Sequence, residues 1–330
     1  MESRTGRTGK PGNRNWLQAL ARVLRWVPLQ WWTLLVLFAA VAGLSPRFYM
    51  PGNLAYFFRQ STPAAFLALG ETFAFLCGGF DLSIGSTMSF ISALASGLMI
   101  GRIENLWWVL PFCMLVGASI GFVNGVVITK LKVPSFLTTL GMMIALQGAA
   151  LVYTGGMPKG GTPDEFRAFG LGKLFGVPYI VLILVLVIAL SQLMLRRTRL
   201  GRSILAVGGN DVASSLMGIN VDRIRVICFT LSSLLTTVGT LLMVSTFRVW
   251  DVNLGLNMEF TAITMVIVGG AAIGGGRGSA VTTVLGWLIM SVLFTVLTLM
   301  GFPQSGQLLA QGAVVLFAAF TNIEARRGIA

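Results

Sequence analysis

The chain has 330 residues, of which 55% are hydrophobic and only 11% are charged, and its mean hydropathy is +0.83. A soluble globular domain carries about 25% charged residues, so this composition excludes a soluble protein and predicts a polytopic membrane protein. Lysine and arginine outnumber aspartate and glutamate by 24 to 11. The basic residues gather between apolar runs, which is the positive-inside pattern of a membrane protein and not the basic face of a nucleic-acid-binding domain.

The residue types that several kinds of chemistry require are missing. The chain has no histidine, which excludes His-based acid–base catalysis and His metal ligands. Cys77, Cys113 and Cys228 each lie in an apolar run without a local partner, so we expect buried free thiols. No triad, paired carboxylates, nucleotide motif or metal cluster occurs, so the sequence predicts neither an enzyme nor a bound cofactor or metal.

Ten apolar segments predict an all-α membrane protein with about ten transmembrane helices. Residues 1–25 predict a basic cytoplasmic tail, 26–321 the transmembrane domain and 322–330 a short cytoplasmic tail. This threading leaves most basic residues in the cytoplasm, and both termini with them. The expected spans are 26–44, 63–79, 83–100, 107–128, 134–153, 177–195, 224–246, 260–274, 279–300 and 305–321.

An acidic residue lies inside the second span. Glu71 falls near the middle of 63–79, where a carboxylate is costly and usually functional. The sequence GGFDLSIGS (78–86) follows and predicts a tight inner turn in which Asp81 or Ser83 caps the next helix. Glu71 and Asp81 are therefore candidates for a translocation path or gate, with packing and capping as the simpler alternatives.

The fourth span carries a ridge of small residues. Gly117, Gly121 and Gly125 recur every four residues, which predicts close packing against another helix. Asn124 lies beside this ridge, where we expect it to hydrogen-bond across helices, with a place on the translocation path as the second possibility. Farther along, 154–176 is rich in glycine and proline and predicts the largest outer loop.

The segment 196–225 is too polar to cross a bilayer, and the arginines at both of its ends predict a cytoplasmic location. Asn210 as N-cap and Gly218 as C-terminal stop predict a helix of two turns between them. A helix this short is not stable alone. We therefore expect its apolar face, which includes Leu216, to dock on a partner.

A second glycine-rich stretch lies between 269 and 278. It does not match a P-loop, because no GK[ST] follows. We expect close helix contact and a flexible inner turn here instead. Glu259, at the start of this region, is the fourth candidate for the translocation path.

Four ordered blocks together resemble the ribose-type permease subunits of bacterial ABC importers for monosaccharides. They are GGFDLSIGS, VPSFLTTLGMM (133–143), AVGGND…LMGI (206–219) and EFTAITMVIVGGAAIGGGRGS (259–279). The resemblance covers about residues 50–320. The sequence departs from the family pattern at Glu71 and Arg277, where uncharged residues are usual.

The resemblance implies a ten-helix permease of the bacterial inner membrane that imports a sugar or sugar-like solute. It further implies a second permease subunit, identical or paralogous, a cytoplasmic ABC ATPase that binds and hydrolyses the nucleotide, and an extracytoplasmic sugar-binding protein. By this similarity the ATPase-coupling segment consists of Gly208, Gly209, Asn210, Asp211, Ala213, Leu216, Gly218 and Ile219.

The main alternative is an ion-coupled secondary transporter of a small polar solute. Such a transporter is expected to need several midmembrane carboxylates or a broken-helix ion site. A membrane enzyme is the third possibility, and it lacks a catalytic constellation.

Overall fold

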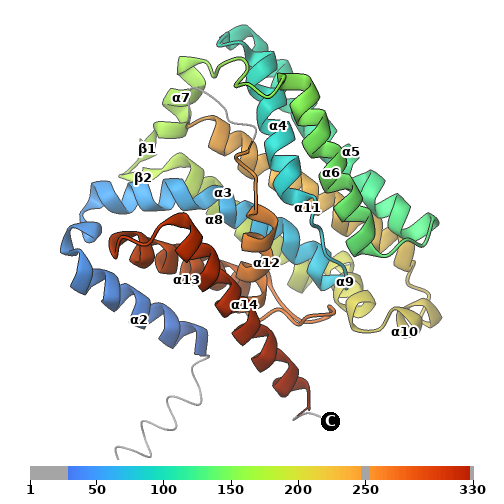
Figure 1. Ribbon diagram of the computed structural model, residues 1–330. Helices are drawn as coiled ribbons and strands as arrows, with labels where there is room; N and C mark the ends of the chain where they lie inside the picture. The colour runs from blue at the N-terminus through green and yellow to red at the C-terminus, as the bar shows by residue number, and fades with distance from the viewer. Residues whose placement is uncertain (1–28, 247–252, 328–330) are drawn as a thin grey trace, which may run out of the picture.

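The computed structural model describes residues 29–246 and 253–327, and this part of the chain is almost entirely helical (Figure 1). The one sheet among these residues is a two-residue antiparallel hairpin, in which Lys173 pairs with Pro178. The elements are α2 (Leu29–Leu44), η1 (Pro46–Tyr49), α3 (Pro51–Leu76), α4 (Ile84–Met99), η2 (Ile103–Asn105), α5 (Leu106–Lys130), α6 (Ser135–Thr154), α7 (Asp164–Leu171), β1 (Lys173–Leu174), β2 (Val177–Pro178), α8 (Tyr179–Arg197), α9 (Arg199–Gly209), α10 (Asp211–Leu216), α11 (Val221–Val244), α12 (Met258–Val268), α13 (Ala280–Leu299) and α14 (Gln304–Arg327).

The apolar helices confirm an all-α polytopic membrane protein. Five stretches, 103–130, α6, α8, α11 and α13, are long and apolar enough to cross a bilayer by length and composition. The count of ten crossings and the cytoplasmic placement of both ends remain predictions. The expected tail at 1–25 lies outside the described residues, and α14 continues past the expected boundary at 321 as far as Arg327.

Helix α3 forms the centre of the molecule. Nearly every residue from Thr62 to Leu76 is buried, and α8, α9, α11, α12 and α13 all contact this helix (Figure 1). This burial on all sides shows that the second half of α3 packs against protein. Helix α8, in contrast, presents a row of leucines and valines outward.

The glycine ridge on α5 packs against α11, as its spacing predicts. A Cβ on Gly121 would lie 2.2 Å from the carbonyl oxygen of Phe229, and one on Gly125 would lie 2.6 Å from the Cα of Val226. The two backbones therefore approach more closely than any larger residue allows.

Three expected boundaries were wrong. In the expected span 260–274 the helix is only α12, whose 11 residues extend roughly 16 Å, about half of the 30 Å of hydrocarbon, and a glycine-rich loop continues the stretch. The following glycines end the helix, because several have positive φ, including Gly270 at +91°. Helix α3 begins at Pro51 and not at 63: a proline starts its first turn, and Ala55 and Phe57 are buried in the more polar part that precedes the apolar run. The stretch after Thr198, for which the sequence predicts no helix before Asn210, is helix α9, and the Thr198 hydroxyl caps it by accepting from the Gly201 amide.

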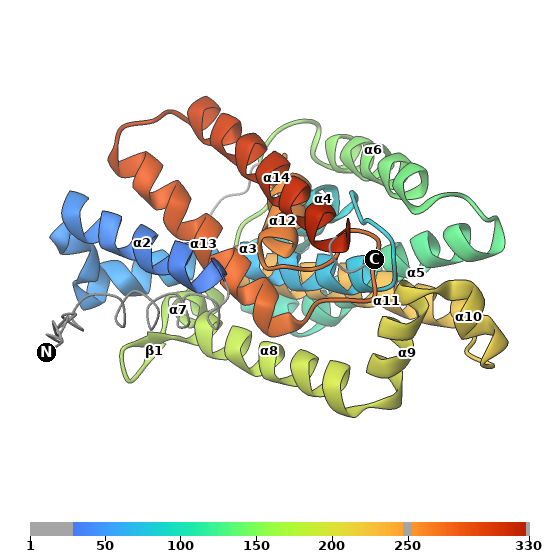
Figure 2. The same ribbon diagram turned by 90° about the horizontal axis from the view of Figure 1, so that it is seen from below.

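The elements at the two ends of α8 lie far apart. Figure 2 shows the β1–β2 hairpin at the end where α8 begins and α9–α10 at the end where it finishes. Under the predicted topology the hairpin end is extracytoplasmic and the α9–α10 end is cytoplasmic.

Candidate functional site

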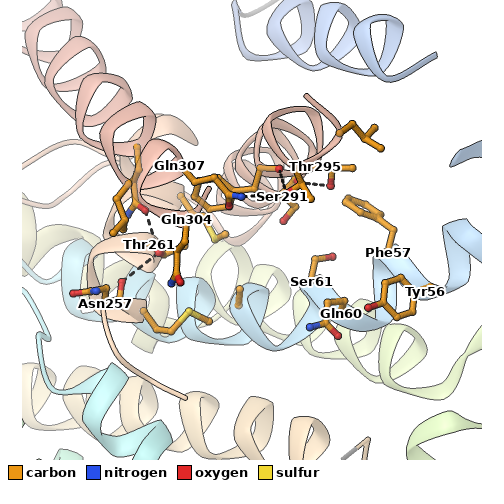
Figure 3. Close-up of a pocket in the computed structure, with 18 of the residues that line it drawn as sticks. Tyr56, Phe57, Gln60, Ser61, Asn257, Thr261, Ser291, Thr295, Gln304 and Gln307 are labelled. Carbon is orange, nitrogen blue, oxygen red and sulfur yellow. Dashed lines mark hydrogen bonds between the residues drawn. The ribbon is translucent and has the colours of Figure 1, made fainter. Parts of the chain in front are cut away.

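A groove of about 630 Å³ opens between the beginning of α3, the beginning of α12, the end of α13 and the beginning of α14 (Figure 3). These helix ends all face the side that the predicted topology makes extracytoplasmic. The 22 residues that line the groove include no charged side chain. Amides, hydroxyls and aromatic rings line it together with aliphatic side chains such as Leu256 and Met265. The polar residues include Tyr56, Gln60, Asn257, Thr261, Ser291, Thr295, Gln304 and Gln307.

Part of this polar lining is already hydrogen-bonded, and part is available. Gln307 donates to the Thr298 hydroxyl at 3.1 Å, and Thr261 donates to the Gln311 side-chain oxygen at 3.4 Å. Gln60 and Gln304 are exposed and make no side-chain hydrogen bond with any described residue. Their amides can therefore bind a polar solute without breaking an existing bond.

The sequence analysis missed these groove residues, although their spacing carries a signal. Gln304, Gln307 and Gln311 recur at three- and four-residue steps, so they share one face of a helix. Ser291, Thr295 and Thr298 do the same on α13. A polar stripe along an apolar helix marks a face turned toward protein or water and away from lipid.

At the opposite end, α10 has the local structure that its sequence predicts. The Asn210 side chain accepts a hydrogen bond from the Ala213 amide at 2.9 Å, and Gly218 has φ +82°. Asp211 forms an ion pair with Arg225 at 2.9 Å, which ties the first turn of α10 to α11. These contacts hold a helix of six residues that could not persist alone.

The outer face of α10 is apolar and uncovered. Leu216 is 85% exposed, Met217 70% and Val212 67%. The chain then turns back through a hydrogen bond from the Ile219 amide to the Ser214 carbonyl at 3.0 Å. Exposed apolar side chains beside a rigid turn are typical of a surface that binds another protein.

Helix α9 is joined to the central helix by a glycine joint, which consists of Gly78, Gly208, Gly209, Gly275 and Gly276. The Gly276 amide donates to the Leu76 carbonyl at 3.0 Å. A Cβ on Gly208 would lie 1.8 Å from that carbonyl oxygen, and one on Gly275 would lie 2.8 Å from the Gly78 nitrogen. The end of α3, the end of α9 and the α12–α13 loop therefore meet backbone to backbone.

The four candidates for the path lie together only in part, and none lines the groove. Glu71, Asp81 and Asn124 are buried in one polar cluster at the α3–α4 turn. Ser83 does not cap α4 with its side chain; instead its amide donates to Asp81. Glu259 is buried at the start of α12 beside Gly85.

Comparison with known proteins identifies relatives that match most of the chain. Residues 53–319 match the family model described as "Branched-chain amino acid transport system / permease component". The chain is 37% identical over 293 residues to the ribose import permease protein RbsC of Escherichia coli (strain K12), covering 88% of this chain and 91% of the relative. It is 35% identical over 295 residues to RbsC of Bacillus subtilis (strain 168), covering 88% and 90%. It is also 30% identical over 304 residues to the galactose/methyl galactoside import permease protein MglC of Escherichia coli (strain K12), covering 86% and 90%. No solved structure matches.

These matches confirm the resemblance to ribose-type permeases. The relatives are transport subunits and not enzymes, and they do not favour a secondary transporter. Together with the apolar helices, they identify a multi-pass protein of the bacterial inner membrane. The chain therefore belongs to the family of branched-chain amino acid transport system / permease components, as the permease subunit of an ABC importer.

Proposed function

We propose that this permease imports a neutral sugar or sugar-like solute, and that the solute enters through the groove between α3, α12, α13 and α14. The observation that carries the proposal is the lining: hydrogen-bonding side chains and aromatic rings without a charged group. Sugars present many hydroxyls and apolar C–H faces, which such a lining can match. The RbsC and MglC relatives are named for ribose and galactose import, which supports the same class.

The lining also argues against an amino-acid substrate, despite the description of the family model. A zwitterion carries an ammonium and a carboxylate, and burying either without a charged partner is costly. Gln60 and Gln304 offer neutral donors and acceptors only. We therefore expect pentoses or hexoses, and not branched-chain amino acids, to be carried.

The exposed face of α10 supports contact with the cytoplasmic ATPase. Its apolar residues stand out on a short helix that Asp211–Arg225 and the Asn210 cap hold in place. A groove on the ATPase would bury Leu216 and Met217. Each fully buried side chain of this size contributes about 1.5–3 kcal/mol.

The polar groove supports a second permease subunit on its open side. Gln304 and Gln60 are exposed and lie at the outer ends of the predicted spans that begin at 305 and 63. A second subunit, identical or paralogous, would cover them and complete the path. We infer that the extracytoplasmic binding protein delivers the solute at this end.

The glycine joint would transmit a movement of α9–α10, driven by the ATPase, to the helices that line the groove. Helix α3 begins at the groove and ends at the joint, and α12 likewise begins at the groove and leads into the Gly275–Gly276 loop. A displacement of α9–α10 by the ATPase would move both helices at once. The roles of Glu71, Asp81, Asn124 and Glu259 in the path remain predictions.

The test is uptake by proteoliposomes that contain the permease, its ATPase and its binding protein. Gln60→Leu and Gln304→Leu remove amides at nearly constant volume and should slow sugar uptake by roughly 2- to 12-fold for each lost hydrogen bond. Leu190→Ala, on the outward face of α8, is the control and should leave uptake unchanged. Unchanged uptake in both glutamine variants, or leucine carried in preference to sugars, would contradict the proposal.

A further inference from the structure

Two buried carboxyl groups lie at the α3–α4 turn, outside both the groove and the coupling segment. Glu71 and Asp81 are each 0% exposed, as are their neighbours Ser83, Asn124 and Ser232. These five residues come from α3, the turn, α5 and α11, so the cluster joins three helices. Neither acid makes an ion pair with a described residue.

The hydrogen bonds are divided very unequally between the two acids. Asp81 accepts at Oδ1 from the Ser83 amide at 3.1 Å and the Ser83 hydroxyl at 2.6 Å, and at Oδ2 from the Ser232 hydroxyl at 2.9 Å. Three hydrogen bonds donated to a carboxylate stabilise its ionised form. Glu71 accepts one bond, at Oε1 from the Asp81 amide at 3.2 Å, and its Oε2 has no partner.

A second unmet acceptor belongs to the same cluster. Asn124 donates through Nδ2 to the Ser83 hydroxyl at 3.0 Å, which fixes its amide against the cluster, and its Oδ1 has no partner. Thr236, one turn from Ser232 on α11, also has a buried hydroxyl without a partner. Glu71 Oε2 and Asn124 Oδ1 are therefore two buried acceptors that receive no hydrogen bond from a described residue, whereas the Thr236 hydroxyl can donate as well as accept.

Among the described residues, no cationic side chain forms an ion pair with either acid. The titratable groups nearby are Cys77 at the end of α3, Cys228 on α11 and Glu259 on α12, and none of them is cationic when charged. The desolvation cost of each buried ion is several kcal/mol, and two adjacent anions also repel each other. One carboxyl of the pair must therefore be neutralised.

We propose that Glu71 is a proton-binding site that holds one proton on Oε2, while Asp81 remains ionised. The proton comes from water and leaves the pair with a single negative charge. It converts the one carboxyl oxygen of the pair that has no partner among the described residues into a hydrogen-bond donor. The protonated Glu71 thus stays on α3 beside the α3–α4 turn, to which its Oε1 is joined by the Asp81 amide.

Loss of the proton should lower the stability of the folded protein. As pH rises and Glu71 ionises, two adjacent anions repel each other across the α3–α4 turn, so the folded protein loses stability toward alkaline pH. Glu71→Gln keeps a donor at this position and cannot ionise, so this variant should lose less stability over the same range. The proposal is independent of the solute that the groove carries.

Infrared spectroscopy of the purified permease in lipid nanodiscs tests the proton directly. The carbonyl stretch of a protonated carboxyl is distinct from the carboxylate bands. At neutral pH we expect a protonated-carboxyl band that disappears in Glu71→Gln and persists in Glu259→Gln, which is the matched control for a buried glutamate. Identical spectra for the wild type and Glu71→Gln in this region would overturn the proposal.

Two further measurements keep the test decisive if a variant folds poorly. Wild-type protein labelled with ¹³C at glutamate carboxyls should shift the band, and an unshifted band would refute protonation of a glutamate. The temperature of thermal unfolding should fall more steeply between pH 6 and pH 9 for the wild type than for Glu71→Gln. Parallel curves would contradict the proposed link between this proton and stability.

Discussion

Two adjacent glycines in the glycine joint should respond in opposite ways to the same substitution. In Gly208→Ala the new Cβ would lie 1.8 Å from the Leu76 carbonyl oxygen and 2.6 Å from the Gly276 nitrogen. Neither neighbour can rotate away, because both are backbone atoms. In Gly209→Ala the new Cβ meets nothing within 4 Å.

The magnitudes follow from these contacts. Making room at Gly208 separates α9 from Leu76 and breaks the 3.0 Å bond between Gly276 and Leu76. The lost bond costs about 0.5–1.5 kcal/mol, and leaving its buried groups unpaired costs about 1–3 kcal/mol. Alanine in place of a helical glycine returns up to about 1 kcal/mol. Gly208→Ala should therefore be destabilised by about 0.5–4.5 kcal/mol, whereas Gly209→Ala should be neutral or slightly stabilised.

Thermal unfolding of the isolated permease in nanodiscs measures this difference without the ATPase. We expect the Gly208→Ala transition below that of the wild type and the Gly209→Ala transition at or above it. Equal transitions for the two variants would show that α9 does not meet α3 backbone to backbone, and would remove the proposed route from α10 to the groove.

Three further predictions concern the coupling segment and the topology. Leu216→Asp places a charge on the exposed face of α10 and should abolish the stimulation of ATP hydrolysis by loaded binding protein, at unchanged membrane levels; wild-type stimulation would refute docking there. Asn210→Ala removes the cap of α10, which costs about 1 kcal/mol, so it should weaken the same stimulation only partly; a loss as complete as that in Leu216→Asp would count against a capping role alone. Reporters fused after Arg197 and Arg326 should read cytoplasmic, and one within 155–172 should read extracytoplasmic. An extracytoplasmic signal at Arg197 would overturn the topology, and with it the sides assigned to the groove and to the coupling segment.

Features set by local sequence could be predicted well. The Asn210 cap, the turn at Gly218 and the glycine ridge on α5 follow from residue type and spacing, and the structure contains all three. Each depends on neighbours within a few residues or on one helix face. Their physical causes are therefore visible in the sequence.

Features that depend on long-range packing could not be predicted. The early start of α3 goes with the burial of Ala55 and Phe57 among other helices, which hydropathy does not encode. The groove brings together 45–64, 256–265 and 291–311, and nothing local joins these stretches. Glu71 stood out because charge inside an apolar run is costly, but its pairing with Asp81 appears only when the turn is folded.

The most direct test of the whole account is solute uptake by the reconstituted complex of permease, ATPase and binding protein. Labelled ribose, galactose and leucine should be compared with and without ATP on the ATPase side. The account predicts uptake of a neutral sugar that requires ATP and the binding protein, persists without an ion gradient, and slows in Gln304→Leu. Uptake driven by an ion gradient in the absence of ATP, or uptake of leucine alone, would contradict it.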